Sequence, residues 1–386
     1  MDAMLHSIEG RWRFVDADYS RLAHFERGPG TPVPAGIVVD QPGWSLYCLD
    51  METRQAVFVE TDADIDLADA PFFYSKQFEA ARRVALVPFA ALGTLAAAVP
   101  APDRLAFIFN TGRCGTTLVN AMLNRVEGVW SLSEPDALFD LAMARDTLDP
   151  AEHRDLLEAS TRLLFRPPSA RAVHTLVIKP RSQSLFHADL AHAAFPDASL
   201  VFMYRDGVGW ARSFFQMATK LGFDPDFDEE NRRFSWWILS GGTDPSYLRP
   251  YLDFDAEIVR VDALLAPVFG LYMETYLRHV RAGVPFLAIR YNELNADRDA
   301  VTARLLRHCG LPETALPAAL SGFESDSQAG TAIGRDRQGA AFGAAERDRF
   351  LSVLAHHPQA GWVDALLPDI DHPERRDQPL ELAASR

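Results

Sequence analysis

A glycine-punctuated turn between two apolar patterns constrains this sequence more than any other feature. The apolar run 105–109 leads into the turn 110–115, and a second apolar pattern with helical spacing begins after residues 116–117. This order predicts a strand, a loop and a helix. Gly112 and Gly115 let the backbone turn its N–H groups inward, and a helix N-terminus adds a positive field. We therefore expect a phosphate or a similar anion to bind at this loop.

The loop differs from the ATP-binding loop that carries a lysine directly before its serine or threonine. Thr116 occupies that position, and Arg113 lies earlier in the loop. Because the motif lysine and a clear magnesium carboxylate are both missing, we expect a nucleotide other than ATP. Taken alone, the segment leaves one alternative open, a tight strand–helix turn that binds nothing.

A second segment supports the nucleotide interpretation. Residues 198–204 form an apolar run typical of a buried strand, and Arg205-Asp206-Gly207 follows at once. A helical pattern comes next and carries Ser213, eight residues after Arg205. The arrangement again places an arginine at the end of a strand.

These segments resemble the sulfotransferases that use 3′-phosphoadenosine-5′-phosphosulfate (PAPS). That family carries a 5′-phosphosulfate loop, [Lys/Arg]-[Ser/Gly/Thr]-Gly-[Thr/Ser]-[Thr/Ser], which residues 113–117 match with Cys114 where serine is common. It also carries an arginine and, eight residues later, a serine for the 3′-phosphate, which Arg205 and Ser213 match. The stretches 177–198 and 290–312 are similar to the family as well. The resemblance spans about residues 104–312.

The resemblance implies PAPS as the donor and a hydroxyl or amine of a small molecule as the acceptor, with no metal required. Arg335, in a loop rich in glycine and polar residues, is a looser match to a basic C-terminal loop of the family. The cofactor-binding residues implied are Gly112, Arg113, Cys114, Gly115, Thr116, Thr117, Arg205, Ser213 and Arg335.

Three residues are candidates for catalysis. Arg113 matches the cation that the family places near the bridging oxygen, where it would offset charge on the leaving phosphate. Glu134, in Ser-Leu-Ser-Glu-Pro, resembles a glutamate that one branch of the family places near the transferred group, and it is the first candidate for the general base. Lys179, one of only three lysines, ends a predicted strand and is the third candidate. His174 and His187 are the alternatives to Glu134.

Composition limits the partners and the compartment. A formal net charge of −15 argues against nucleic acid or an anionic membrane and favours a small acceptor. Three cysteines give no disulfide framework, and no signal peptide is visible, so we expect a cytoplasmic protein. Pro88, Gly93 and Pro100 interrupt the apolar stretch 84–102, which predicts a helix of about ten residues rather than a membrane span. Homo-oligomerisation stays open.

The fold class predicted is α/β, a three-layer P-loop fold in which a central parallel sheet is flanked by helices. This domain is expected over residues 101–386, with strands near 105–109, 175–179, 199–204 and 285–290. Its helices are expected near 116–125, 184–194, 207–220 and 295–309. Residues 1–100 are expected to form a small α+β appendage of unknown role, with a hairpin from 44–50 and 56–60 and a helix over 70–83.

Other interpretations remain beside the sulfotransferase. An enzyme of the same fold that uses another phosphorylated donor would need a divalent metal and ignore a 3′-phosphate. A catalytically silent protein would bind the nucleotide alone. The aromatic residues after the second motif suit an ordinary core better than an acceptor pocket; they are Phe214, Phe215, Phe223, Phe227, Trp236 and Trp237.

Overall fold

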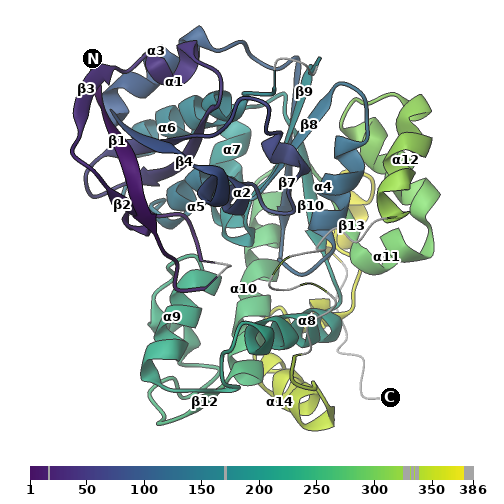
Figure 1. The fold of residues 1–386 in the computed structure, drawn as a ribbon. Helices are drawn as coiled ribbons and strands as arrows, with labels where there is room; N and C mark the ends of the chain where they lie inside the picture. The colour runs from purple at the N-terminus through teal and green to yellow at the C-terminus, as the bar shows by residue number, and fades with distance from the viewer. Residues whose placement is uncertain (16–17, 169–171, 325–330, 332–333, 335–338, 378–386) are drawn as a thin grey trace. The chain divides into compact units, whose positions relative to one another are not determined.

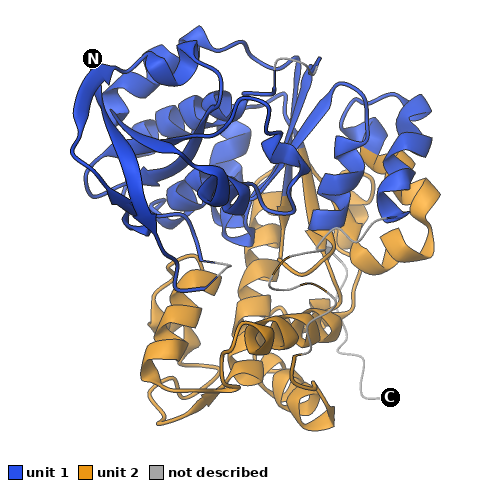
Figure 2. Ribbon diagram, viewed as in Figure 1, with its two compact units in different colours: residues 1–108, 117–199, 306–327 blue, residues 109–116, 200–305, 328–386 orange. Residues whose placement is uncertain are grey.

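The computed structural model describes residues 1–386 except 16–17, 169–171, 325–330, 332–333, 335–338 and 378–386. The chain forms two compact units that alternate along the sequence (Figure 2). Unit 1 comprises residues 1–108, 117–199 and 306–327, and unit 2 comprises residues 109–116, 200–305 and 328–386. This alternation does not test whether residues 1–100 fold separately, so the predicted boundary near residue 100 stays a prediction.

The N-terminal part of unit 1 is a six-stranded sheet in the order β2-β1-β6-β5-β4, with β3 beside β1. Its strands are β1 (Asp2–Arg11), β2 (Phe25–Arg27), β3 (Thr31–Pro34), β4 (Trp44–Asp50), β5 (Gln55–Glu60) and β6 (Arg83–Pro88). All its pairings are antiparallel, and β4 and β5 form the predicted hairpin. Tyr47, Val57 and Val84 lie in the core on one face of this sheet.

The helix predicted over residues 70–83 is wrong at its C-terminal end. Helix α2 covers Phe73–Ala80, and strand β6 begins at Arg83. Because β6 lies between β1 and β5 and its four central residues are buried, its sequence is continuously apolar and lacks the alternation that marks a half-exposed strand. Helix α3, Phe89–Ala98, follows directly and is the predicted helix of ten residues.

The second sheet has five strands in the order β13-β10-β7-β9-β8 (Figure 1). Its strands are β7 (Arg104–Asn110), β8 (Val129–Ser133), β9 (Thr175–Lys179), β10 (Ser199–Tyr204) and β13 (Phe286–Arg290). Four of them were predicted, and β8 was missed because two serines interrupt its short apolar run. The pairs β10–β13, β7–β9 and β8–β9 are parallel. The predicted fold class, a parallel sheet flanked by helices with a further α+β part, is confirmed.

Most predicted helices of this fold are present. The remaining helices are α1 (Ile37–Asp40), α4 (Thr116–Asn124), α5 (Asp136–Met143), α6 (Pro150–Leu164), α7 (Ala188–Ala194), α8 (Gly207–Lys220), α9 (Glu229–Leu239), α10 (Val261–Arg281), α11 (Tyr291–Ala296), α12 (Arg298–His308), α13 (Leu316–Leu320) and α14 (Ala344–Leu354). A small two-stranded sheet joins β11 (Asp226–Phe227) to β12 (Val259–Arg260).

Two predicted helices have different bounds. The helix over 184–194 begins as a 3-10 turn, η3 (Ser182–His187), before α7. The helix over 295–309 is divided into α11 and α12, because Asp297 starts a new helix by accepting a hydrogen bond from the Ala300 N–H at 3.1 Å. Of the six aromatic residues after the second motif, Phe214, Phe215, Phe227 and Trp236 are buried, as expected for core.

Candidate active site

The loop between β7 and α4 has a backbone conformation that most residues avoid. Gly112, Arg113 and Gly115 have φ values of 73°, 52° and 84°. Left-handed residues in such a turn point backbone N–H groups to one side, where they can bind an anion. The Asn110 Oδ1 accepts a hydrogen bond from the Gly112 N–H at 2.8 Å and closes the turn. Helix α4 then begins at Thr116, and the first N–H groups of a helix have no partner inside it. This local geometry suits a phosphate.

Two of the predicted catalytic residues share a strained backbone. Among the described residues, only Arg54, Arg113 and Glu134 combine a positive φ with a side chain, and Arg54 lies in the turn between β4 and β5. The left-handed conformation costs a residue with a Cβ about 1–2 kcal/mol. Such residues gather at functional sites, where the surrounding structure holds them in place. Two of the three residues with this conformation, Arg113 and Glu134, are therefore residues that the sequence motifs also indicated.

Hydrogen bonds inside unit 2 hold the loop against the end of β10. The Cys114 thiol is buried and donates to the Met203 carbonyl oxygen at 3.3 Å. The Thr111 N–H donates to the same carbonyl at 3.2 Å, and the Trp210 indole N–H donates to the Thr111 carbonyl at 2.9 Å. The Cys114 side chain thus anchors the loop, so a ligand contact at this position would come from the backbone.

Unit 2 brings the two predicted phosphate motifs together. The Arg113 Nε donates to the Ser213 Oγ at 3.1 Å, although the two residues are 100 positions apart. The Arg205 guanidinium lies 4.9 Å from the centroid of the Tyr291 ring, and its Nε lies 3.8 Å from an Asp206 carboxylate oxygen. Arg113, Arg205 and the residues that they contact here all belong to unit 2.

Tyr291 was not predicted as a site residue, yet it contacts both motifs. A Cβ at Gly115 would lie 2.5 Å from the Tyr291 ring, so glycine is needed there both for its φ and for space. The stretch 290–294 had been noted for its resemblance to the family, but nothing in it pointed to the ring. We call Gly112, Arg113, Gly115, Arg205, Ser213 and Tyr291 the loop cluster.

Glu134 and Lys179 form an ion pair within unit 1. Glu134 directly follows β8, and its N–H donates to the Lys179 carbonyl at 2.7 Å, which extends the pairing of β8 with β9 by one residue. The Lys179 ammonium contacts the Glu134 Oε1. The lysine side chain is 3% exposed and the glutamate side chain is 17% exposed. The structure thus pairs two of the three predicted catalytic residues with each other.

A second ion pair, which the sequence did not indicate, lies two residues further along both strands. Asp136 accepts hydrogen bonds from the Arg181 Nε at 2.6 Å and from its NH2 group at 3.1 Å. Burial lowers the pKa of Arg181, but the neighbouring Asp136, Tyr74 and Glu134 together outweigh this effect and keep that pKa well above its ordinary value. We call Glu134, Asp136, Lys179 and Arg181 the carboxylate cluster.

Strand register relates Lys179 to the neighbouring strands β7 and β8. Phe107 of β7 pairs with Ile178 of β9, and Ser133 of β8 pairs with Lys179, all in parallel. The carboxyl ends of β7, β8 and β9 therefore lie at one edge of the sheet, where ligands of such sheets bind. The predicted cofactor-binding residues Thr116 and Thr117 begin helix α4, and their exposed fractions are 4% and 8%.

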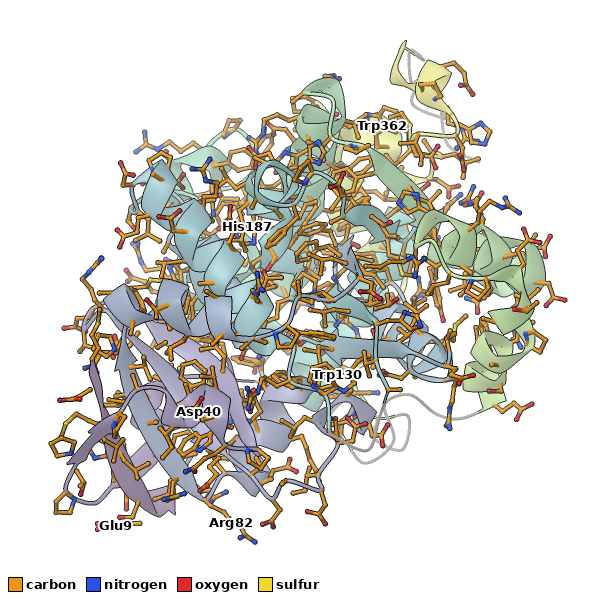
Figure 3. The ribbon with its side chains drawn as sticks, turned by 90° about the horizontal axis from the view of Figure 1, so that it is seen from above. Glu9, Asp40, Arg82, Trp130, His187 and Trp362 are labelled. Carbon is orange, nitrogen blue, oxygen red and sulfur yellow. The ribbon has the colours of Figure 1, made fainter. Side chains whose placement is uncertain are left out.

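The alternative bases and Arg335 are placed differently. His174 precedes β9, so it lies at the opposite end of that strand from Lys179, and its Nδ1 is 2.9 Å from the Thr175 Oγ1. His187 is buried in η3 with its ring 5.3 Å from the His153 ring (Figure 3). Arg335 lies outside the described residues. Neither histidine thus has the position at a strand's carboxyl end that Glu134 has.

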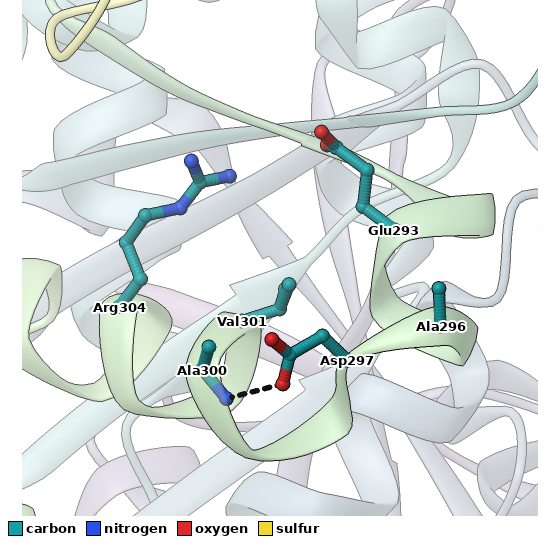
Figure 4. Close-up of a pocket in the computed structure, with 6 residues that line it drawn as sticks. All are labelled: Glu293, Ala296, Asp297, Ala300, Val301 and Arg304. Atoms are coloured by element: carbon teal, nitrogen blue, oxygen red, sulfur yellow. Dashed lines mark hydrogen bonds between the residues drawn. The ribbon is translucent and has the colours of Figure 1, made fainter.

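Other features of the described residues add no competing site. No group of three or more His, Cys, Asp or Glu side chains in this part of the chain is arranged to hold a metal ion. No helix among these residues is long and apolar enough to span a membrane. An open pocket of about 330 Å³ lies at α11 and α12 (Figure 4), and it contains none of the predicted site residues.

No family model and no curated protein matches this chain. Among solved structures, it is similar to a sulfotransferase from Alicyclobacillus acidocaldarius, with 14% identity and a TM-score of 0.38 over 70% of this chain and 98% of that one. A sulfotransferase from Mycobacterium tuberculosis matches with 15% identity and a TM-score of 0.35 over 66% and 78%. The sulfotransferase domain of the curacin biosynthetic pathway matches with 14% identity and a TM-score of 0.36 over 73% and 94%.

Proposed function

We propose that this chain is a sulfotransferase that moves a sulfuryl group from PAPS to a hydroxyl, or an amine, of a small-molecule acceptor. The observation that carries the proposal is the hydrogen bond between Arg113 and Ser213. One residue belongs to the motif that resembles a 5′-phosphosulfate loop, and the other belongs to the motif that resembles a 3′-phosphate site. A nucleotide with phosphate groups at both the 3′ and the 5′ position of its ribose would use both motifs.

The loop cluster has the features that such a donor needs. Backbone N–H groups of residues 112–117 would hold the 5′-phosphate, and the hydroxyls of Thr116 and Thr117 would add hydrogen bonds. Arg205 and Ser213 would hold the 3′-phosphate. The strained Arg113 backbone fits a loop shaped around a ligand.

When bound, PAPS supplies the sulfuryl group: its sulfur–oxygen bond to the 5′-phosphate breaks, a new bond to the acceptor oxygen or nitrogen forms, and adenosine 3′,5′-bisphosphate leaves with the electron pair. Arg113 would stabilise negative charge on that leaving phosphate, a task for which its planar guanidinium is suited. Because the arginines of the loop cluster supply positive charge, we propose a reaction that requires no metal.

Glu134 would accept the proton of the acceptor as the general base. Lys179 would hold the carboxylate in one position through the contact with Oε1. The strained φ of Glu134 supports this role, because residues in such conformations gather at functional sites. The net charge of −15 and the sparse cysteines further support a small acceptor and a cytoplasmic location.

Calorimetry with adenosine 3′,5′-bisphosphate, ADP and AMP tests the donor assignment. We expect adenosine 3′,5′-bisphosphate to bind about ten- to a hundredfold more tightly than AMP, with or without Mg²⁺, because one charge-assisted phosphate contact contributes about 1.5–3 kcal/mol. Equal affinities, or tight ADP binding that needs Mg²⁺, would favour a phosphotransferase. Selective binding without transfer of ³⁵S-sulfate from PAPS to any small hydroxyl or amine compound would favour a silent binding protein.

A further inference from the structure

The ends of strands β8 and β9 carry the same pattern with opposite charges. Residues 134–136 read Glu-Pro-Asp, and residues 179–181 read Lys-Pro-Arg. In the register of these parallel strands Ser133 lies opposite Lys179, and the charged side chains pair one residue beyond it: Glu134 with Lys179, and Asp136 with Arg181. Each proline restricts its own φ and removes an N–H donor, so the strand pairing ends there. The second pair therefore sits where it can hold the strand ends that carry the first.

The second pair is buried and is completed by the N-terminal region of the same unit. The side chain of Asp136 is 0% exposed and that of Arg181 is 12% exposed. The Ser20 N–H donates to the Asp136 Oδ2 at 2.7 Å, and the Arg181 NH2 group donates to the Asp18 carbonyl at 3.3 Å. The Arg181 guanidinium also lies 4.2 Å from the centroid of the Tyr74 ring, on α2.

These contacts have an energetic reason. A buried ion pair is stable only when further hydrogen bonds compensate for the water that both ions lose. The main chain at residues 18–20 supplies one donor and one acceptor, and the Tyr74 ring covers the guanidinium. Burial raises the pKa of Tyr74 and Arg181 opposes the rise, whereas the charges of Glu134 and Asp136 add to it. Tyr74 is therefore within electrostatic reach of the first pair as well.

We infer that the N-terminal region supplies positioning residues for the proposed general base: residues 18–20 and Tyr74 hold the Asp136–Arg181 pair, and this pair holds the strand ends that carry Glu134 and Lys179. Residues 1–100 thereby gain a role in the reaction, and the carboxylate cluster is incomplete without them. The role of Glu134 rests on the proposed function, whereas the coupling between residues 18–20 and Lys179 does not.

Ser20 offers a matched pair of variants. Ser20→Pro removes the N–H that donates to Asp136, whereas Ser20→Ala keeps it. The readout is the NMR signal of Lys179 in protein labelled with ¹³Cε-lysine. The chain has only three lysines, Lys76, Lys179 and Lys220, so the signal can be assigned with Lys179→Arg.

We expect the Lys179 signal to move in Ser20→Pro and to stay in place in Ser20→Ala, while the signal of Lys220 stays in place in both. Tyr74→Leu, which removes the ring from Arg181, is the second variant if Ser20→Pro does not fold, and it should move the same signal. An unchanged Lys179 signal in the folded variant, with only a lower melting temperature, would overturn the inference.

Calorimetry on the same samples separates this inference from the proposed function. The affinity of Ser20→Pro for adenosine 3′,5′-bisphosphate should stay within about twofold of wild type, since the loop cluster is untouched. If the wild-type protein does not bind the nucleotide but the Lys179 signal still moves, the proposed function fails and the coupling stands. If the nucleotide binds and the Lys179 signal does not move, the proposed function is supported and the coupling fails.

Discussion

The loop cluster and the carboxylate cluster hold their charges in opposite ways. In the loop cluster, Arg113 donates to the Ser213 hydroxyl, the Arg205 guanidinium lies over the Tyr291 ring, and the Asp206 carboxylate is 3.8 Å from Arg205. In the carboxylate cluster, Lys179 and Arg181 each contact a carboxylate directly. The first cluster has half-buried cations beside a glycine-rich loop, whereas the second has matched ion pairs between the ends of two strands.

This difference separates two kinds of task. A left-handed loop whose backbone N–H groups point to one side, with arginines beside it, gains electrostatic energy when an anion arrives, so it is suited to binding. A cluster of matched pairs gains little from a further charge, so it is suited to holding one side chain in a defined position. We derive four expected outcomes from this contrast between the two clusters. A different result in any of the four experiments would weaken the contrast.

Glu134→Gln should have the largest effect, a loss of about a hundred- to ten-thousandfold in turnover, because glutamine cannot accept the acceptor's proton. Affinity for adenosine 3′,5′-bisphosphate should hardly change. Single-turnover transfer of ³⁵S-sulfate to an acceptor found by screening measures the effect. Glu158→Gln, on the exposed side of α6, is the control and should match wild type. Retention of more than about a third of the wild-type rate would exclude Glu134 as the base.

Arg113→Ala should lower turnover by about a hundred- to a thousandfold, because the guanidinium acts on charge that develops in the transition state. Binding of the product nucleotide should weaken far less. Arg212→Ala, which removes an exposed arginine of α8, controls for loss of charge. The comparison of the rate with the calorimetric Kd decides between two roles. Normal turnover with weakened affinity would make Arg113 a binding residue only.

Arg205→Ala should weaken binding of adenosine 3′,5′-bisphosphate by about ten- to a hundredfold and leave binding of AMP unchanged, because only the first ligand has a 3′-phosphate. Calorimetry with both ligands measures the ratio. An equal loss for both would show that Arg205 does not recognise the 3′-phosphate.

Gly115→Ala should destabilise the protein more than Gly222→Ala, by about 1 kcal/mol or more in urea unfolding. Both glycines have a positive φ, 84° and 91°, so both variants bear the same backbone strain. Only at Gly115 would the new Cβ meet the Tyr291 ring, and at Gly222 nothing lies within 4 Å. Equal destabilisation would show that the ring moves aside and that Tyr291 does not support the loop.

The sequence predicted the strand–loop–helix order and four strands of the parallel sheet, because each of these depends on local pattern, whereas Glu134 was singled out by a resemblance to the family. Glycine spacing reports φ, and an apolar run bounded by Pro, Gly or Arg reports a buried strand. Strand β8 escaped because two of its five residues, Ser131 and Ser133, are buried serines that break the apolar run, and the Ser131 Oγ donates to the Asn120 Oδ1 at 2.6 Å.

Partners across the sheet could not be predicted. That Lys179 contacts Glu134 depends on β9 lying next to β8, which are separated in the chain by α5 and α6. Likewise, Tyr291 meets Gly115 only through the tertiary structure of unit 2. The Glu-Pro-Asp and Lys-Pro-Arg segments were the available signal for the paired strand ends, but opposite charges indicate a contact only once the register is known.

The alternation of the two units along the chain has a consequence for biosynthesis. Residues 306–327 belong to unit 1, and residues 109–116 belong to unit 2, although each segment is surrounded in sequence by the other unit. Unit 1 thus cannot be completed on the ribosome until residues 200–305 of unit 2 have been translated. Long-range closure of this kind slows folding and prolongs the exposure of apolar strands. Nascent chains that stop before residue 306 should therefore depend on chaperones more than a protein whose domains follow one another.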